Sequence, residues 1–223
     1  MKIALSGTGR MGASVRRIST ERGHEVVAEF DIDRAITMEA LSGVDVVIDF
    51  SHAAAISDVL NATCGAGVNL VIGTTGWNDR IDEIRQKCLA AGIGIVWAPN
   101  FSPGANILFA ISRQASQLAA TFGGFESGIE ERHHVGKKDS PSGTAIRVAE
   151  EVEKGGSDLP GITAKRVGHE SGLHTLFFDS ADDLIELTHR ARGRDGFARG
   201  AVIAAELLEG KKGFFSFEEL IGL

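Results

Sequence analysis

The first hundred residues alternate short apolar runs with amphipathic stretches, and this alternation constrains the fold more than any other feature. Five of the apolar runs have the length and composition of strands: residues 2–6, 25–30, 45–50, 69–72 and 93–98. Helical periodicity lies between them, most clearly over residues 10–22 and 78–91. Strands that are almost entirely apolar are typical of a parallel sheet covered by helices on both faces. We therefore predict a Rossmann-type, doubly wound α/β domain.

The pattern changes after residue 102. Helical stretches over residues 106–122 and 144–154 flank a strand-like run and a polar loop at 133–143. Three more strands, at 163–167, 174–179 and 183–190, indicate a mixed or antiparallel sheet. We expect the final helix, near 197–209, and the tail to pack back on the first domain. The predicted organisation is residues 1–102 with 196–223 as one domain and 103–195 as a central α+β domain.

Charge and composition exclude several classes of partner. The 223 residues carry a formal net charge of −7, which argues against nucleic acid or an anionic membrane surface as a partner. No apolar run approaches the roughly 18 residues that span a bilayer, and the start of the chain does not resemble a signal peptide. We expect a cytoplasmic protein. Cys64 and Cys88 lack metal-ligand spacing, so we expect free thiols and no metal site.

A glycine-rich turn follows the first predicted strand. It has the G-x-G-x-x-G pattern, with Gly7, Gly9 and Gly12, and it opens the first predicted helix. Such glycines permit a tight turn, close approach of a pyrophosphate and close helix–strand packing, while the helix N-terminus attracts phosphate. Asp31 ends the second strand, where an acid usually binds the adenosine ribose. A dinucleotide site is favoured over a purely structural turn. The residues of the turn assigned to the cofactor are Gly7, Thr8, Gly9, Arg10, Met11 and Gly12.

The choice between NADH and NADPH stays open at this point. Asp31 repels a 2′-phosphate and so favours NADH, whereas Arg34 is close enough in sequence to offset that repulsion. Two more segments, at the ends of the fourth and fifth strands, are expected on the nicotinamide side, because ligands bind beyond the carboxyl ends of parallel strands. Ordinary turns are the alternative for each. The assigned residues are Gly73, Thr74, Thr75, Ala98, Pro99, Asn100 and Phe101.

The loop over residues 130–145 carries the most chemistry. It holds two adjacent histidines, two lysines and a Ser-Gly-Thr sequence that begins a helix. A polar surface loop with a capped helix is one interpretation, and no further spacing supports zinc. The other is an anion site at the helix N-terminus, with a proton donor beside it. In that interpretation the carboxylate of a small substrate lies against the amides of residues 142–144, and Lys137 or His133 transfers a proton.

The same loop resembles the dihydrodipicolinate reductase family, whose hallmark is E-x-H-H-x-x-K-x-D-x-P-S-G-T-A. Here it spans Glu131 to Ala145. The segments G-T-G-R-M-G, V-I-D-F-S, G-T-T-G and A-P-N-F-S are similar to that family's segments and stand in the same order, so the resemblance covers nearly the whole chain. It implies a substrate-binding and tetramerisation domain at 103–195, a homotetramer, and NADH- or NADPH-dependent reduction of a cyclic imine dicarboxylate in diaminopimelate–lysine biosynthesis.

The resemblance also implies roles for single residues. His133 resembles the family's acid/base histidine and Lys137 its proton donor. Residues 7–12, 31, 73–75 and 98–101 resemble its nucleotide contacts, and a hinge near 101–104 is expected to close the domains over both ligands. The expected dicarboxylate contacts are His134, Ser142, Gly143 and Thr144.

Two alternatives to a reductase are a non-catalytic dinucleotide sensor and a related two-domain dehydrogenase that acts on an amino acid or a semialdehyde. A non-catalytic dinucleotide sensor has no need of a proton donor beside an anion site, so His133 and Lys137 argue against it. An aldehyde dehydrogenase needs a cysteine nucleophile at the site, and both cysteines fall on predicted helices away from the strand ends. His174 and His189 are interpreted as hydrogen-bonded residues of the sheet rather than as ligands.

Overall fold

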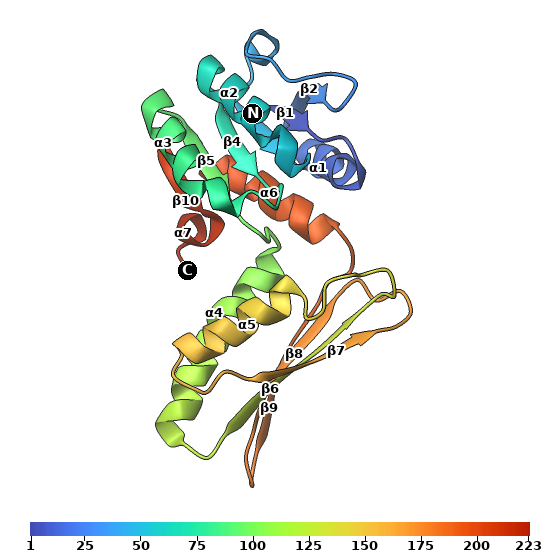
Figure 1. Ribbon diagram of the computed structural model, residues 1–223, viewed down its shortest axis with the longest axis vertical. Coiled ribbons are helices and arrows are strands. Elements are labelled where there is room, and N and C mark those ends of the chain that lie inside the picture. The colour runs from blue at the N-terminus through green and yellow to red at the C-terminus, as the bar shows by residue number, and fades with distance from the viewer. The chain divides into compact units, whose positions relative to one another are not determined.

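The computed structural model describes residues 1–223 and divides into two compact units (Figure 1). The first combines Met1–Ser102 with Arg194–Leu223, and the second is Pro103–Gly193. None of the helices combines the length and the apolar character that a membrane span requires.

A six-stranded parallel sheet forms the centre of the first unit, in the order β10-β5-β4-β3-β1-β2. The strands are β1 (Lys2–Ser6), β2 (Glu25–Phe30), β3 (Val46–Asp49), β4 (Asn69–Ile72), β5 (Gly94–Trp97) and β10 (Gly213–Ser216). The order reverses between β1 and β3, which lie side by side although β2 separates them in sequence. This topology brings the carboxyl ends of β1 and β3 together, and doubly wound sheets bind ligands at that point.

Helices cover both faces of this sheet. Alternate strand residues point to opposite sides, so Ile3 and Leu5 join one buried cluster and Ala4 joins the other. The first cluster includes α1 (Arg10–Glu21), α6 (Asp195–Leu207) and α7 (Phe217–Ile221), and the second includes α2 (Ile56–Ala66) and α3 (Ile81–Ala91). Short 3₁₀ turns lie at Glu39–Leu41, Ala53–Ala55 and Asn78–Arg80. The predicted doubly wound fold is confirmed.

The C-terminal tail contributes more than sequence analysis predicts. Its residues form β10, which pairs in parallel with β5, and then α7. Phe214 stacks on Trp97 with ring centroids 6.4 Å apart, and Phe217 is buried against Phe101 at 5.1 Å. The aromatic side chains of the tail therefore complete the edge of the sheet and its core.

The second unit is a mixed four-stranded sheet with two helices. Its order is β7-β6-β8-β9, where β6 and β7 are parallel and the other pairs are antiparallel. The elements are α4 (Pro103–Phe122), β6 (Glu126–His133), α5 (Gly143–Lys154), β7 (Gly161–Arg166), β8 (Leu173–Asp179) and β9 (Leu184–Arg190). Both helices contribute to one apolar core with the sheet, at Leu108 and Val148 among others. The expected mixed sheet is thus present.

The register of this sheet places a polar row directly beside the apolar core. Ile129, Leu176 and Leu187 pair across β6, β8 and β9 and pack against the helices. The next row on the same face lies two residues further along each strand and consists of Glu131, His174 and His189. The polar row therefore continues the helix-covered face of the sheet beyond the end of its apolar core.

Candidate active site

The three glycines of the loop 7–12 have different surroundings. Gly7 has φ +85°, and a Cβ there would lie 2.4 Å from the carbonyl oxygen of Phe50. A Cβ at Gly12 would lie 2.2 Å from the carbonyl oxygen of Gly7, so α1 packs directly on the turn. Gly9, by contrast, has no atom within 4 Å of its Cβ position. Its open space is where a pyrophosphate would approach the backbone.

The N-terminus of α1 fits an anionic ligand. Gly9 is the N-cap and supplies no side chain to the first N–H groups of the helix, and the first turn contains no acidic residue. These donors and the positive end of the helix dipole attract phosphate. The residues present therefore fit the pyrophosphate of a dinucleotide.

Asp31 is fixed at the end of β2 by Thr8 of the same loop. The Thr8 hydroxyl and its backbone N–H both donate to Asp31 Oδ2, the latter at 2.8 Å. The hydrogen bond from the Thr8 side chain, followed by those from the backbone of Thr8 and Ile32, lowers the pKa of Asp31 below its ordinary value of 3.8. An ionised acid is thus held beside the glycine loop.

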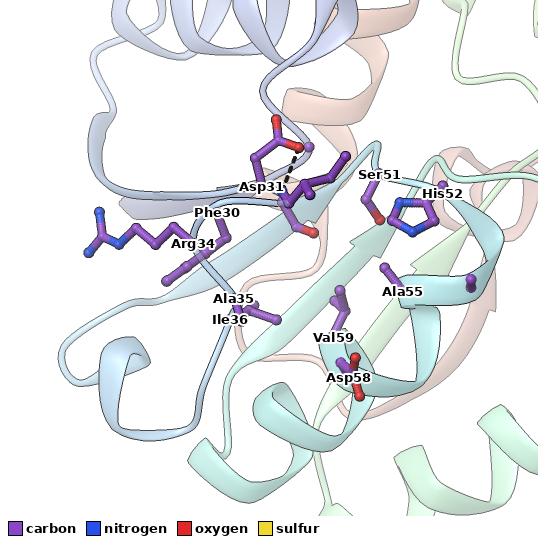
Figure 2. A pocket seen from close by; sticks show the side chains of 14 residues that line it. Phe30, Asp31, Arg34, Ala35, Ile36, Ser51, His52, Ala55, Asp58 and Val59 are labelled. Carbon is purple, nitrogen blue, oxygen red and sulfur yellow. Dashed lines mark hydrogen bonds between the residues drawn. The ribbon is translucent and has the colours of Figure 1, made fainter.

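A pocket opens beside Asp31, between the ends of β1 and β2 and the segment 51–59 (Figure 2). Arg34 and His52 also line it. The Arg34 guanidinium lies over the Phe30 ring at 5.3 Å, and the backbones of Asp31 and Arg34 exchange two hydrogen bonds, at 3.1 and 2.9 Å. The site therefore presents one carboxylate and one guanidinium at the position expected for the adenosine half of a dinucleotide.

A buried carboxylate positions the next loop. Asp49, at the end of β3, accepts hydrogen bonds of 2.6 Å from the hydroxyls of Ser51 and Thr74. Thr74 also accepts a 2.6 Å hydrogen bond at its carbonyl oxygen from the Trp77 indole N–H. The loop 73–76 is therefore held to β3 through Thr74, while Thr75 is exposed.

The segment 98–101 divides between core and surface. Ala98 is buried, Pro99 is exposed and Asn100 is half-buried, accepting a 2.8 Å hydrogen bond from the N–H of Ser102. Phe101 is only 2% exposed and packs in the core on Phe217. Its side chain therefore supports the segment and leaves only its backbone for ligand contact.

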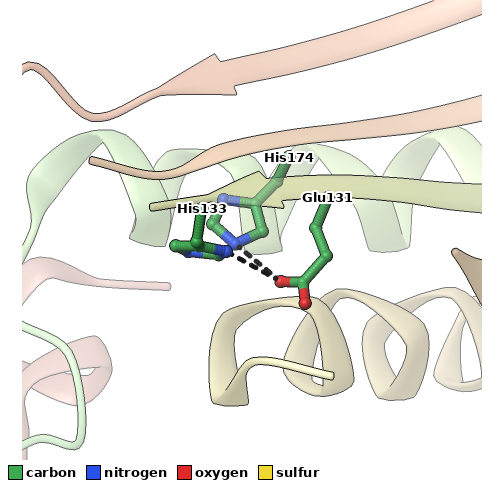
Figure 3. A group of neighbouring side chains, drawn as sticks. All are labelled: Glu131, His133 and His174. Carbon is green, nitrogen blue, oxygen red and sulfur yellow. Dashed lines mark ion pairs between the residues drawn. The ribbon is translucent and has the colours of Figure 1, made fainter. Parts of the chain in front are cut away.

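In the second unit, Glu131, His133 and His174 point toward one another (Figure 3). Glu131 Oε2 lies 3.4 Å from His133 Nδ1 and 3.6 Å from His174 Nε2. Its other oxygen, Oε1, accepts a hydrogen bond from the N–H of Ser142 at 3.0 Å and one from Arg166 Nη2 at 2.8 Å. The Glu131 side chain is completely buried, so every contact of the carboxylate is internal.

Burial shifts the pKa of each member of this cluster. For Glu131, burial raises the pKa, but hydrogen bonds from Ser142 and Arg166 outweigh it and the net shift is downward. Burial lowers the pKa of His133 below 6.5; Glu131 opposes this, and Lys137 adds to it. Burial, followed by the proximity of His133, lowers the pKa of His174 to about 4. At neutral pH the cluster thus contains a carboxylate and two neutral imidazoles.

Lys137 lies on the loop that follows β6. Its ammonium group pairs with Asp139 Oδ1 at 2.8 Å and remains 26% exposed. The backbone of this loop is anchored by Arg166, which donates to the carbonyl oxygen of Asp139 at 2.5 Å. A charged, accessible ammonium group is therefore held near the buried imidazole of His133, close enough to lower its pKa.

At the start of α5, Ser142 caps the helix as expected, but its backbone N–H is not available to a ligand. The Ser142 hydroxyl accepts a 3.2 Å hydrogen bond from Ala145 N–H and lies 3.1 Å from His174 Nε2. Because the Ser142 N–H donates to Glu131, that amide is already engaged inside the protein. Gly143 is exposed, with open space at its Cβ position. His134 is half-buried, and its N–H donates to the carbonyl oxygen of Glu170 at 2.8 Å.

The cluster also resembles a metal-ligand set, because one atom each of Glu131, His133 and His174 lie within 4.8 Å of one another. Two His and one carboxylate are common zinc ligands. The same carboxylate, however, binds the Arg166 guanidinium, and Lys137 lies near His133. A divalent cation would add two positive charges beside these cations, so the electrostatics favour proton chemistry over metal binding.

Sequence analysis does not single out Glu131, beyond its place in the loop pattern, or Arg166, and the structure places both in this cluster. The expectation that His174 is a hydrogen-bonded residue of the sheet is confirmed, since it lies on β8 with its Nε2 3.1 Å from the Ser142 hydroxyl. Spacing offered one signal: Glu131 and His133 are two residues apart on a strand and so share a face. The pairing of Glu131 with His174 depends on strand register, which the sequence does not reveal.

Comparison with protein families gives two adjoining matches. Residues 1–101 match the family model described as "Dihydrodipicolinate reductase, N-terminus", and residues 104–221 match "Dihydrodipicolinate reductase, C-terminus". A 4-hydroxy-tetrahydrodipicolinate reductase of Christiangramia forsetii is 37% identical, with 99% of this chain and 98% of that protein covered. One from Archaeoglobus fulgidus is 35% identical, with 99% and 100% covered.

Solved structures show the same fold at lower sequence identity. A dipicolinate-bound dihydrodipicolinate reductase from Paenisporosarcina sp. TG-14 superposes with a TM-score of 0.81 at 20% identity, covering 99% of each chain. A DAP dehydrogenase of C. glutamicum in complex with DAP gives a TM-score of 0.56 at 14% identity, with 98% of this chain and 93% of that chain covered.

Proposed function

This chain belongs to the dihydrodipicolinate reductase family, and from that premise we propose how its own residues perform the family's reaction. It is an NAD(P)H-dependent oxidoreductase that reduces the dihydrodipicolinate-type cyclic imine dicarboxylate to tetrahydrodipicolinate, a step of lysine biosynthesis through diaminopimelate. The observation that carries the residue assignment is that the Lys137 ammonium, paired with Asp139, lies close enough to buried His133 to lower the pKa of its imidazole.

The first unit holds the dinucleotide. Gly7–Gly12 and the N-terminus of α1 bind the pyrophosphate, and Asp31 accepts hydrogen bonds from the adenosine ribose. Residues 73–75 and the backbone of 98–101 contact the nicotinamide half. When bound, the nicotinamide supplies the hydride. Asp49 is not in contact with the cofactor in this scheme and acts by holding Thr74 in place.

The compensating proton comes from Lys137. His133 is neutral near pH 7, because burial lowers its pKa, and it therefore carries no second proton to give. Lys137 is charged, paired with Asp139 and accessible. We assign Lys137 as the proton donor and His133 as the neutral acid/base group that aligns it. Positioned proton transfer of this kind contributes about 10²–10⁴-fold to rate.

The substrate carboxylates bind at the start of α5. The exposed amide of Gly143, the neighbouring Thr144 and the imidazole of His134 supply hydrogen bonds, and the helix dipole and Lys137 supply positive charge. Ser142 acts indirectly, because its hydroxyl caps the helix and its amide holds Glu131. The carboxylates thereby orient the accepting carbon for reduction.

The assembly we propose is a cytoplasmic homotetramer formed through the second unit. Leu184 and Ile185 of β9 are large apolar residues that are 60% and 44% exposed, a feature of surfaces that bind another chain. Light scattering on the purified protein tests this assembly, and a monomer at micromolar concentration would rule it out.

The reaction is tested by following absorbance at 340 nm with NADH, and separately with NADPH. The substrate is generated in the cuvette from pyruvate and aspartate semialdehyde by the preceding synthase. Oxidation of either cofactor that depends on this protein supports the assignment. A flat trace with both, in the presence of an active control reductase, would instead favour a dinucleotide-binding sensor.

A further inference from the structure

The Glu131 carboxylate is oriented asymmetrically. Oε1 is held by two donors, Ser142 N–H and the Arg166 guanidinium, at 3.0 and 2.8 Å. Oε2 has no hydrogen-bond partner of its own; it lies 3.4 Å from His133 Nδ1, which also has none, and 3.6 Å from His174 Nε2, which lies nearer to the Ser142 hydroxyl. Because Oε1 is fixed from two sides, the direction in which Oε2 points is fixed as well.

A carboxylate only accepts hydrogen bonds, so the ring nitrogen that faces it is the one that carries the proton. We propose that Glu131 is the positioning residue of His133, holding its imidazole in the tautomer with a proton on Nδ1 and an unprotonated Nε2. This inference rests on the proposed function of His133. It assigns Glu131 a role in catalysis although Glu131 is completely buried and touches neither ligand.

The environment of Nε2 supports this assignment. A Cβ at Gly172 would begin 3.2 Å from His133 Nε2, and Gly172 has φ +153°, a conformation that favours glycine. A side chain at this position would cover the Nε2 edge of the ring. Glycine keeps this edge open, so Nε2 is the nitrogen through which His133 meets the substrate or Lys137.

The remaining charged and titratable groups around His133 do not compete for its Nδ1 proton. His174 is neutral near pH 7, and its Nε2 lies 3.1 Å from the Ser142 hydroxyl. Arg166 is engaged by Glu131 Oε1 and the Asp139 carbonyl oxygen. Lys137 is paired with Asp139. Glu131 Oε2 is therefore the acceptor that decides the tautomer.

Glu131→Gln gives a sharp test. The Gln carbonyl oxygen must take the place of Oε1, because Ser142 N–H and Arg166 both donate there. The amide NH₂ then takes the place of Oε2 and donates toward His133 Nδ1. We expect the tautomer to invert, with the proton moving to Nε2, and kcat to fall by about 10²-fold or more while KM changes little.

The primary readout is the ¹⁵N NMR spectrum of the imidazole nitrogens of His133 in the full-length protein at pH 7.5. Protonated and unprotonated ring nitrogens have clearly different shifts, and the measurement needs neither substrate nor cofactor. A wrong tautomer assignment is therefore distinguishable from a wrong reaction assignment, because the 340 nm assay reports only the reaction. A wild-type protein with the proton on Nε2 would overturn the inference without any variant, so the test survives a variant that does not fold.

Glu151→Gln is the matched control. Glu151 is another buried carboxylate of the second unit, bound by Arg113, Arg147 and Lys154 on α4 and α5. This substitution also removes a buried charge, but the three cations that bind Glu151 are not partners of Glu131 or His133. We expect an unchanged His133 tautomer and kcat within about twofold at a temperature where the protein is folded. Tautomer inversion in both variants, or in neither, would contradict a specific role for Glu131.

Discussion

Glu131 and His174 face each other across the antiparallel pair of β6 and β8, with Glu131 Oε2 3.6 Å from His174 Nε2. The pair lies in the row that follows the apolar row of Ile129 and Leu176 on the same face of the sheet. A polar cluster is thereby buried at the margin of a hydrophobic core, where hydrogen bonds and charge replace apolar packing. Neutral histidine is stable there and its protonated form is not.

Acidification should destabilise the protein through His174. The unfolded chain takes up this proton near pH 6.5, whereas the folded chain takes it up only near pH 4, so the unfolded state binds more protons between these values. Stability is fully retained above pH 6.5 and decreases as the pH falls toward 4, by up to about 3 kcal/mol for this residue. Urea unfolding at several pH values measures this change in the free energy of unfolding. His174→Gln should show a shallower dependence, and an identical slope in both proteins would refute the assignment.

Replacing Lys137 should affect the chemical step. In Lys137→Met the side chain keeps its length but loses its proton and charge, so kcat should fall by about 10²–10⁴-fold. NADH affinity should be unchanged, because Gly7–Gly12 are untouched. The neighbouring exposed residue Lys138 provides the control, and Lys138→Met should retain wild-type kcat. Equal losses in both variants, measured by steady-state kinetics, would point to general electrostatics instead.

Two glycine substitutions in one loop should separate folding from cofactor binding. Gly12→Ala places a Cβ 2.2 Å from the Gly7 carbonyl oxygen and should destabilise the fold by about 1–3 kcal/mol. Gly9→Ala meets no protein atom within 4 Å and should fold normally, yet it should bind NADH at least about tenfold more weakly because its methyl group occupies the pyrophosphate approach. Thermal melting and NADH fluorescence titration distinguish the two. Normal NADH binding by Gly9→Ala would contradict the placement of the pyrophosphate beside Gly9.

Cofactor preference should depend on Asp31. Its lowered pKa keeps it ionised at neutral pH, and an ionised carboxylate repels the 2′-phosphate of NADPH. We expect NADH to be preferred, and Asp31→Asn to shift the ratio of kcat/KM values toward NADPH by about tenfold or more. Asp33→Asn removes a neighbouring exposed charge and should leave the ratio nearly unchanged. Arg34→Ala should move the ratio in the opposite direction to Asp31→Asn.

The fold around the glycine loop was largely predictable from sequence. Gly7, Gly9 and Gly12 form the G-x-G-x-x-G pattern, and the positive φ of Gly7 and the contact of a Gly12 Cβ with Gly7 are local requirements for glycine. Strand β10 was not predicted, because four residues of a tail become a strand only when β5 provides a partner. The supporting role of Asp49 was missed for a similar reason: its partner Thr74 is 25 residues away in sequence.

The polar row of the second unit was only partly predictable. The loop around His133 and Lys137 was predicted from its residue types and from a family resemblance. The roles of His174 and Arg166 depend on register, since His174 lies opposite Glu131 and Arg166 opposite His133. No local pattern specifies such pairing. Phe101 is a different case: the sequence predicts that it lies in a cofactor-binding segment, but its ring packs in the core.

The discontinuity of the first unit has a consequence for biosynthesis. Helix α6 supplies Ala198, Ala201 and Val202 to the core on one face of the six-stranded sheet, and β10 supplies its edge strand. During translation, the second unit, which is continuous in sequence, can form its core before Arg194–Leu223 are made, whereas the first unit cannot. Until Arg194–Leu223 are added, the face of the sheet that α6 covers is an exposed apolar surface, which is prone to aggregation.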